Sequence, residues 1–168
     1  MDNRAAGQIP QKAARYIVLL GSAILALLVG TFVYLVDRDW ASTQFLSPLA
    51  ALQGDPAAFF GALGQVLPSF CHAYAFTLLL IMALGASRHA RPFGAAVWFA
   101  IAAGLELLQA GRMQLLAQEP TALLAGSPLA NSVRAYVVNG HFDSGDLIAA
   151  AVGCLAAYIV SSVLEVPK

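Results

Sequence analysis

Long apolar stretches alternate with shorter polar segments along the chain, and this pattern predicts four membrane-spanning helices. A helical span needs about 20 mainly apolar residues, because the hydrocarbon core of a bilayer is about 30 Å thick. Four stretches come close to this length, at about 16–36, 66–86, 93–109 and 147–164. The sequence therefore predicts an all-α, polytopic transmembrane helical bundle, contained in a single domain over residues 1–168.

The first stretch resembles the start of a signal peptide, because it follows a polar segment with Arg4, Lys12 and Arg15. It is long for the apolar part of a signal peptide. It also ends at Val36 and Asp37 without a small-residue cleavage site. We therefore expect an uncleaved first span.

The distribution of Lys and Arg predicts the orientation of the spans, because cytoplasmic flanks of membrane proteins are enriched in these residues. One side of the membrane has Arg4, Lys12, Arg15, Arg88, Arg91 and Lys168. The other side has Arg38, Arg112 and Arg134, spread over two long loops. We expect both termini and the turn 87–92 in the cytoplasm, and the loops 37–65 and 110–145 outside.

Both outer loops are more apolar than ordinary solvated loops. Their large apolar side chains include Phe45, Leu49, Phe59, Leu116, Leu123 and Leu129. Ser127 and Pro128 are typical of a helix start. We expect short interfacial helices in both loops, lying in the outer interface or packed over the bundle. A poorly ordered loop is the alternative, because Gly and Pro are frequent here.

The composition argues against several classes of protein. Hydrophobic residues make up 60% of the chain and charged residues only 11%, whereas about 25% of the residues in a soluble domain are charged. Nine Lys and Arg balance nine Asp and Glu, and no basic stripe of the kind that binds nucleic acid is present. Cys71 and Cys154 lie in apolar stretches and are interpreted as small buried side chains. A soluble enzyme, a disordered chain and a nucleic-acid-binding protein are therefore disfavoured.

Ionisable side chains at membrane depth indicate where a function resides, because each costs about 2.5–3.5 kcal/mol at the bilayer centre. His72 lies near the outer end of the second stretch. Glu106 and Gln109 lie three residues apart, and so on one face, in the outer third of the third stretch. Asp146 opens the fourth stretch, where a helix N-terminus favours a carboxylate. The predicted topology brings all four to a similar depth near the outer face.

Each of these residues also has a purely structural interpretation. His72 and Gln109 are suited to hydrogen bonds between helices, and Asp146 is suited to capping a helix. Glu106 fits such a role least well, because a carboxyl this deep must be paired or protonated. A shared polar pocket explains the four residues together better than four independent roles.

The chemistry of this pocket suggests ligand binding, with catalysis left open. His72, Glu106 and Asp146 are candidate catalytic residues, because a His and a carboxylate act as acid and base in a site that excludes water. Arg112 is a candidate partner for phosphate. The predicted ligand-binding set is His72, Glu106, Gln109, Arg112, Asp143 and Asp146. Two acidic residues disfavour a simple anion as the ligand unless one is protonated or a metal intervenes.

Known catalytic and cofactor signatures are missing from the sequence. It has no Gly-x-Ser-x-Gly, no His-Glu-x-x-His, no Cys-x-x-Cys and no phosphate-binding loop. No cofactor is predicted. A metal site from His141, Asp143 and Asp146 is disfavoured, because ligands spaced this loosely are common in loops.

Three short motifs, at 70–78, 104–109 and 142–149, together resemble the VanZ-like family of bacterial membrane proteins. That family has a His followed by an aromatic residue on one span, as at His72, and a Glu-x-x-Gln on the next, as at Glu106. An Asp-x-x-Asp-Leu then opens a last span that contains a Gly, as at Asp143 and Gly153. The resemblance covers about 67–158. It implies an envelope protein of the bacterial inner membrane from a family associated with glycopeptide-antibiotic resistance.

Two functions fit these observations, and a third fits less well. The first is binding or processing of a membrane lipid or lipid-linked headgroup, with the apolar loops lining the entry of its chain. The second is a non-catalytic accessory subunit of a membrane-protein complex, because small residues such as Ala100, Gly104 and Gly153 let helices approach closely. A proton or ion pathway ranks last, because the second stretch has only Thr77 as a polar residue inward of His72.

Overall fold

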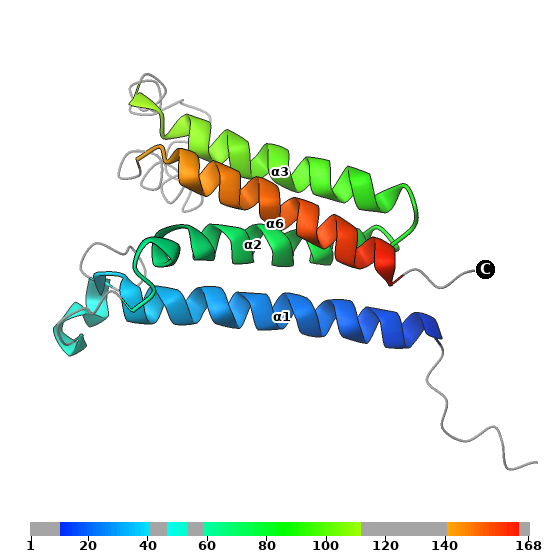
Figure 1. Cartoon of the computed structure of the whole chain (residues 1–168), viewed down its shortest axis with the longest axis horizontal. Coiled ribbons are helices and arrows are strands. Elements are labelled where there is room, and N and C mark those ends of the chain that lie inside the picture. The colour runs from blue at the N-terminus through cyan, green and yellow to red at the C-terminus, as the bar shows by residue number, and fades with distance from the viewer. Residues whose placement is uncertain (1–10, 41–46, 54–58, 112–140, 165–168) are drawn as a thin grey trace, which may run out of the picture.

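The computed structural model describes residues 11–40, 47–53, 59–111 and 141–164, and within these ranges its regular elements are all helical. Four long helices are present: α1 (Gln11–Asp37), α2 (Ala62–Ala83), α3 (Ala90–Leu108) and α6 (Ser144–Val163). Each is long and apolar enough to cross a membrane. The predicted all-α bundle with four spans is therefore confirmed (Figure 1).

The long helices begin three to five residues before the apolar stretches that predicted them. Hydrophobicity marks only the part of a helix that lies in hydrocarbon, whereas the polar first turn belongs to the same helix. At α6 the helix start is set by Asp143, whose Oδ1 accepts a hydrogen bond from the Gly145 amide at 2.7 Å. An Asp in this position satisfies an amide that has no partner within the helix.

The second helix ends at Ala83, three residues earlier than its apolar stretch. The chain turns there through Gly85 and Ala86, whose φ angles are 83° and 51°. Such positive angles are incompatible with continuing a right-handed helix, and they close the last turn of many helices. The side-chain Oγ of Ser87 then accepts a hydrogen bond from the Ala90 amide at 3.2 Å, at the start of α3.

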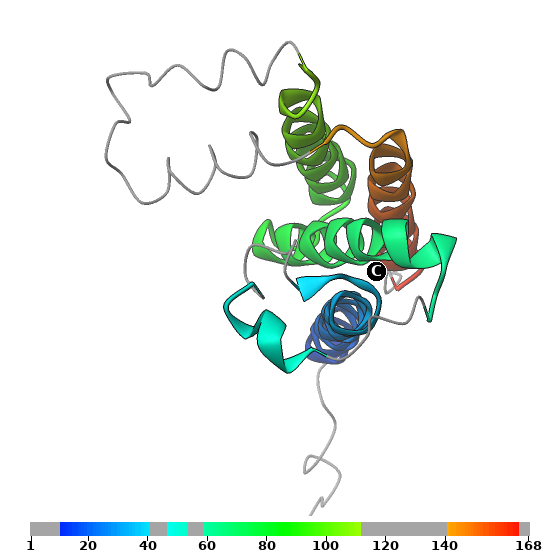
Figure 2. The ribbon, with the colours of Figure 1, turned by 90° about the vertical axis from the view of Figure 1, so that its left-hand side faces the viewer.

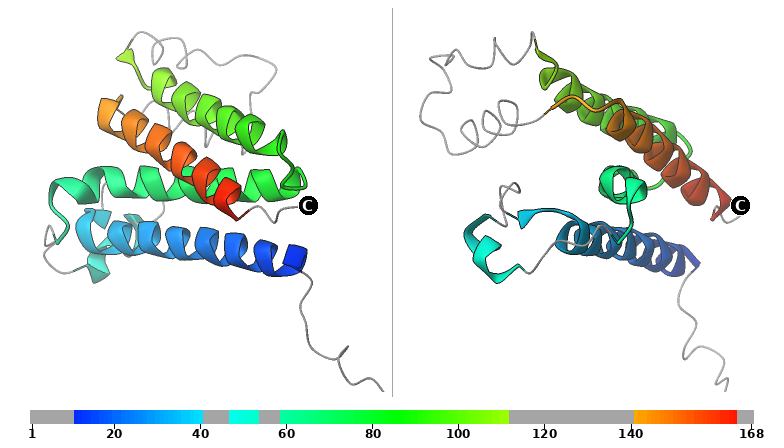
Figure 3. Two further views of the ribbon diagram at one scale, coloured as in Figure 1. Left: turned by 45° about the vertical axis from the view of Figure 1, so that its right-hand side comes forward. Right: turned by 60° about the vertical axis from the view of Figure 1, so that its left-hand side comes forward.

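The four helices alternate in direction, so the bundle has two distinct ends (Figure 1). At the loop end, α1 and α3 finish and α2 and α6 begin. At the turn end, α1 and α3 begin and α2 and α6 finish. Helix α2 contacts each of the other three, and α3 also contacts α6. Seen from the loop end, α1 lies on one side of α2, and α3 and α6 lie on the other (Figures 2 and 3).

Small residues hold α2 against its neighbours. A Cβ atom at Gly153 of α6 would lie 2.6 Å from the carbonyl oxygen of Phe70, and one at Gly30 of α1 would lie 3.1 Å from the Cβ of Cys71. Close backbone approach through small residues is typical of membrane helix packing, because dispersion contacts replace the hydrophobic effect there. These contacts fix the rotation of α1 and α6 about α2, and therefore which of their side chains meet.

The first long loop is tied to the end of α1. The carboxylate of Asp37 accepts hydrogen bonds from the amides of Phe59 and Phe60 at 2.7–3.1 Å. The Gln53 side chain binds the backbone of both Arg38 and Trp40 at 2.8 Å. A short 3-10 helix, η3 (Ser47–Leu52), is present in this loop, as predicted. The helix expected in the second loop, with its start at 127–128, lies outside the described residues.

Candidate polar site at the loop end

The start of α6 is linked to α2 and α3 by polar contacts. The Asp143 amide donates to Oε2 of Glu106 on α3, at 3.4 Å. The Ser69 hydroxyl of α2 donates to Oδ1 of Asp146 in the first turn of α6, at 2.7 Å. Glu106 and Asp146 are half-buried, and the carboxylates of Asp143 and Asp146 both act electrostatically on Glu106. Three carboxylates therefore gather where α3 ends and α6 begins.

His72 lies in a row of aromatic rings that crosses α1, α2 and α3. Its ring centroid is 6.2 Å from that of Tyr34 on α1 and 6.3 Å from that of Phe76, one turn further along α2. Phe76 in turn stacks on Trp98 of α3, with 4.8 Å between centroids. His72 is half-buried, and no hydrogen bond joins its ring to another described residue.

Helix α1 contributes the positive charge of the site. The Cζ of Arg38, one residue beyond α1, lies 5.6 Å from the centre of the Tyr34 ring. Its Nη2 donates to the Gln65 carbonyl at 2.7 Å, and its buried Nε has no hydrogen-bond partner among the described residues. Tyr34 lies within electrostatic reach of Arg38 and also of Glu106 and Asp146. Tyr34 thus connects the cationic side of the site with its acidic side.

All four long helices, or the residues that adjoin them, therefore contribute to one group of side chains at the loop end. We call this group the polar cluster. It consists of Tyr34, Arg38, Ser69, His72, Glu106, Asp143 and Asp146. The alternating direction of the helices brings all of these residues except His72 toward the loop end, whereas His72 lies at the middle of α2.

The structure brings together three of the six predicted ligand-binding residues, namely Glu106, Asp143 and Asp146. His72, predicted near the outer end of its span, lies instead at the middle of α2 because the helix begins at Ala62, and its ring contacts are with Tyr34 and Phe76. Gln109 is buried at the end of α3, where its backbone amide donates to the Glu106 carbonyl at 3.0 Å. This backbone contact closes the last turn of α3, and a ligand-binding role of the Gln109 side chain stays a prediction. Arg112, the predicted phosphate partner, lies outside the described residues.

Sequence reasoning missed Tyr34, Arg38 and Ser69. The signal was present, because Tyr34 and Arg38 are four residues apart and therefore on one face at the outer end of the first stretch. Ser69 precedes His72 by three residues and shares its face in the same way. Arg38 was counted only for topology, although it adjoins the span at the depth predicted for the other site residues.

The arrangement of Ser69, His72 and Asp146 differs from that of a nucleophilic triad. In a triad the serine hydroxyl bonds to the histidine, and the histidine bonds to the carboxylate. Here the Ser69 hydroxyl donates directly to Asp146. The acceptor of the Ser69 hydroxyl is therefore a carboxylate, and the imidazole of His72 takes no part in this contact.

The candidate metal ligands do not converge. His141 and Asp143 are exposed just before α6, and Asp146 is half-buried in its first turn. In the described ranges, no group of three or more His, Cys, Asp and Glu side chains is placed to hold a metal ion. The carboxylates of Asp143 and Asp146 instead bind the Gly145 amide and the Ser69 hydroxyl.

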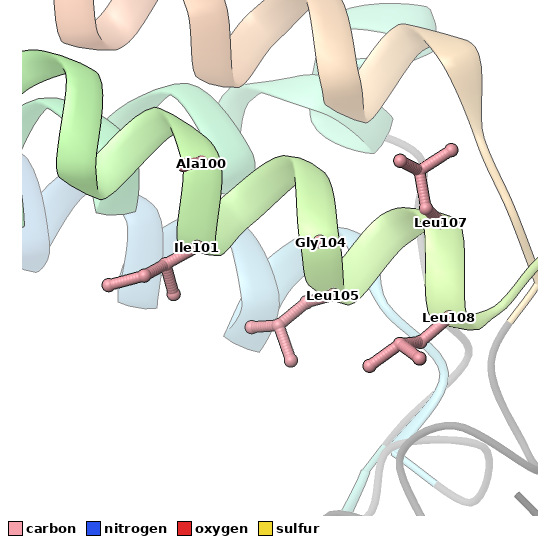
Figure 4. A pocket seen from close by; sticks show the side chains of 6 residues that line it. All are labelled: Ala100, Ile101, Gly104, Leu105, Leu107 and Leu108. Carbon is pink, nitrogen blue, oxygen red and sulfur yellow. The ribbon is translucent and has the colours of Figure 1, made fainter.

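A separate apolar hollow lies along α3. Its described lining consists of Ala100, Ile101, Gly104, Leu105, Leu107 and Leu108. Figure 4 shows Ile101, Leu105 and Leu108 projecting from the same side of the helix. No charged or hydrogen-bonding side chain is among these residues, so the hollow suits an apolar chain or helix rather than a polar ligand.

No protein-family model, curated protein or solved structure matches this chain. The resemblance to the VanZ-like family therefore rests on the three short motifs and stays a prediction. The four-helix fold and the polar cluster follow from this chain's own residues and do not depend on that resemblance.

Proposed function

We propose that this chain binds a lipid or lipid-linked headgroup of the bacterial cell envelope in the polar cluster. The observation that carries the proposal is the group of carboxylates of Glu106, Asp143 and Asp146 at the loop end of an otherwise apolar bundle, with Arg38 following the end of α1 at the same end. Desolvating charged groups is costly, and clusters of them in membrane proteins mark functional sites. A headgroup supplies the polar partners that the cluster lacks.

The surroundings of the polar cluster favour a ligand with an apolar tail. Helix α1 exposes a broad apolar face, with Ile17, Leu25, Leu28 and Phe32 each more than half exposed. Phe76, one turn from His72 along the aromatic row, is 37% exposed. A lipid with its headgroup in the cluster has apolar side chains beside its acyl or isoprenoid chains.

The direct test is native mass spectrometry of the gently extracted chain, with Glu106→Gln beside it. We expect the wild type to retain a lipid and Glu106→Gln to lose it, because the substitution removes a charge with almost no change of shape. Ser22→Ala is the control, since Ser22 bonds to Tyr74 at 2.6 Å away from the cluster. Equal lipid retention by all three proteins would contradict the proposal.

We place the loop end outside and both termini in the cytoplasm of the inner membrane, on the distribution of Lys and Arg. The test is labelling of single introduced cysteines, since Cys71 and Cys154 are buried and give little background. A membrane-impermeant maleimide is expected to label His141→Cys in intact cells and Ser87→Cys only after lysis. The opposite pattern would invert the orientation.

An accessory subunit is the second candidate, and the exposure of α3 favours it. In its most apolar 18 residues, α3 has only 11% buried, whereas the corresponding part of α2 has 39% buried. The apolar hollow lies on this helix. A stoichiometric membrane-protein partner that is retained by the purified chain, and lost with Gly104→Leu, would support this candidate over lipid binding.

A further inference from the structure

Charge is divided unequally between the two ends of the bundle. The acidic side chains in the described ranges all lie at the loop end, namely Asp37, Asp39, Glu106, Asp143 and Asp146. The turn end has Lys12, Arg15, Arg88 and Arg91, and no described carboxylate. In the full sequence, the segments that begin α1, join α2 to α3 and follow α6 contain six Lys and Arg but only two acidic residues. The turn end therefore attracts an anionic partner.

Hydrogen bonds bring the basic segments of the turn end together. Nη2 of Arg15 donates to the carbonyls of Ala86 and Ser161, and so joins the start of α1 to the turn after α2 and to the last turn of α6. Lys12 precedes Arg15 by three residues and lies on the same face of α1. Arg88 follows Ala86 by two residues, within the turn itself. Lys12 and Arg88 therefore lie on two segments that Arg15 holds in contact.

The cations of the turn end differ in their availability to a partner. Arg15 is half-buried and is engaged with the two carbonyls, and Arg91 is buried. Lys12 and Arg88 are exposed, and neither makes a hydrogen bond or an ion pair with another described residue. Their side chains offer three and five N–H donors, respectively. Arg15 thus has a structural role, and Lys12 and Arg88 are the groups that can bind an anion.

Large apolar side chains adjoin both exposed cations on the side of the spans. Ile17 lies five residues into α1 from Lys12, and Phe93 lies five residues into α3 from Arg88; both are more than half exposed. Leu84, just before the turn, is also exposed. A phospholipid presents a charged headgroup above apolar chains, so it contacts both kinds of side chain at once. An acidic soluble protein would contact only the cations. The arrangement therefore favours a lipid.

We propose that the turn end binds anionic phospholipids through Lys12 and Arg88. This surface is separate from the polar cluster, which lies at the opposite end of the bundle and is mainly acidic. Each Lys or Arg near a membrane surface strengthens the attraction of anionic lipids about fivefold, the equivalent of about 1 kcal/mol. Two such residues are expected to give a preference of about 25-fold over a lipid without net charge.

The test is lipid titration of the full chain in detergent, followed by native mass spectrometry. Phosphatidylglycerol is the anionic probe, and phosphatidylcholine with identical acyl chains is the reference without net charge. We expect the wild type to prefer phosphatidylglycerol, and the double variant Lys12→Gln with Arg88→Gln to lose most of this preference. The matched control is Lys12→Arg with Arg88→Lys, which keeps both charges and is expected to keep the preference. Glu106→Gln, at the opposite end, is also expected to keep it.

The outcomes that overturn this proposal differ from those that overturn lipid binding in the polar cluster. Equal affinities of the wild type for the two lipids would overturn anionic-lipid binding at the turn end and leave the polar cluster untouched. A preference that is lost with Glu106→Gln but kept by the double Gln variant would move the anionic lipid to the polar cluster. Salt-sensitive capture of an acidic protein, without any preference for phosphatidylglycerol, would make the turn end a protein-binding surface instead. Unchanged thermal stability of the double Gln variant is expected, because Lys12 and Arg88 are exposed.

Discussion

The two ends of the bundle both bring an arginine next to helix termini, but they use it differently. At the turn end, Nη2 of Arg15 donates to the carbonyls of Ala86 and Ser161, at 3.2 Å and 3.0 Å. These carbonyls lie in the turn after α2 and in the last turn of α6, where helix carbonyls lack partners and a cation is favoured. At the loop end, Arg38 lies over the Tyr34 ring and donates a hydrogen bond to the Gln65 carbonyl at 2.7 Å.

This difference shows how a structural arginine is distinguished from a binding one. Both residues bury an Nε atom without a described partner, so that feature alone does not separate them. The neighbours do. Arg15 satisfies carbonyls that the fold itself leaves unpaired. Arg38 gives one hydrogen bond to the Gln65 carbonyl and also lies over the Tyr34 ring, on which Glu106 and Asp146 act electrostatically. Arg15 at the turn end is therefore interpreted as a structural residue that joins helix ends, and Arg38 at the loop end as a residue of the candidate binding site.

The largest expected effect comes from a substitution at the contact between α2 and α6, because the geometry of both ends of the bundle depends on this contact. Gly153→Leu forces a side chain toward the Phe70 carbonyl, which a Cβ atom alone would approach to 2.6 Å. We expect a loss of about 3 kcal/mol in the free energy of unfolding, as for severe overpacking, together with loss of lipid retention. Gly104→Leu is the matched control for stability, because nothing lies within 4 Å of a Cβ atom there. Equal thermal stability of the two variants in detergent would contradict the packing of α6 on α2.

Separate substitutions of the two arginines distinguish the structural role of Arg15 from the binding role of Arg38. Arg15→Gln removes charge-assisted hydrogen bonds to two carbonyls, so we expect it to lower the free energy of unfolding by about 1.5 kcal/mol. Lipid retention by the folded protein is expected to stay unchanged. Arg38→Gln is expected to do the reverse, lowering lipid retention with little change in thermal stability. If both variants lost stability and kept the lipid, the contrast between the two ends would be wrong.

The sequence was a good guide to the spans because a bilayer imposes a length on each apolar stretch. It was a good guide to the depth of Glu106 and Asp146, which lie at one end, but not to that of His72, because α2 begins four residues before its apolar stretch and puts His72 at its middle. It was a poor guide to rotation. Lipid-facing and buried faces are both apolar, as Leu25 and Leu19 of α1 illustrate with 62% and 0% exposure. The rotation that brings Tyr34 onto His72 depends on the fit of Gly30 against Cys71, which is a property of the pair of helices.

The smallest expected effect compares two serine hydrogen bonds of similar length. Ser69 donates to Asp146 within the polar cluster at 2.7 Å, and Ser22 pairs with Tyr74 at 2.6 Å between α1 and α2. Hydrogen bonds between membrane helices contribute about 0.6 kcal/mol on average, so each change to Ala is expected to lower stability only slightly.

The two serine variants are expected to differ in binding. Loss of the Ser69 hydroxyl frees Asp146 to rotate out of its position in the site, and a change of about 0.6 kcal/mol corresponds to about a threefold weaker lipid affinity. Ser22→Ala is expected to leave the affinity unchanged, because Tyr74 does not belong to the cluster. Lipid titration of both variants in nanodiscs measures this difference. Equal affinities would mean that Ser69 and Asp146 act as interhelical contacts only, and the site would then consist of Arg38, Tyr34, His72 and Glu106.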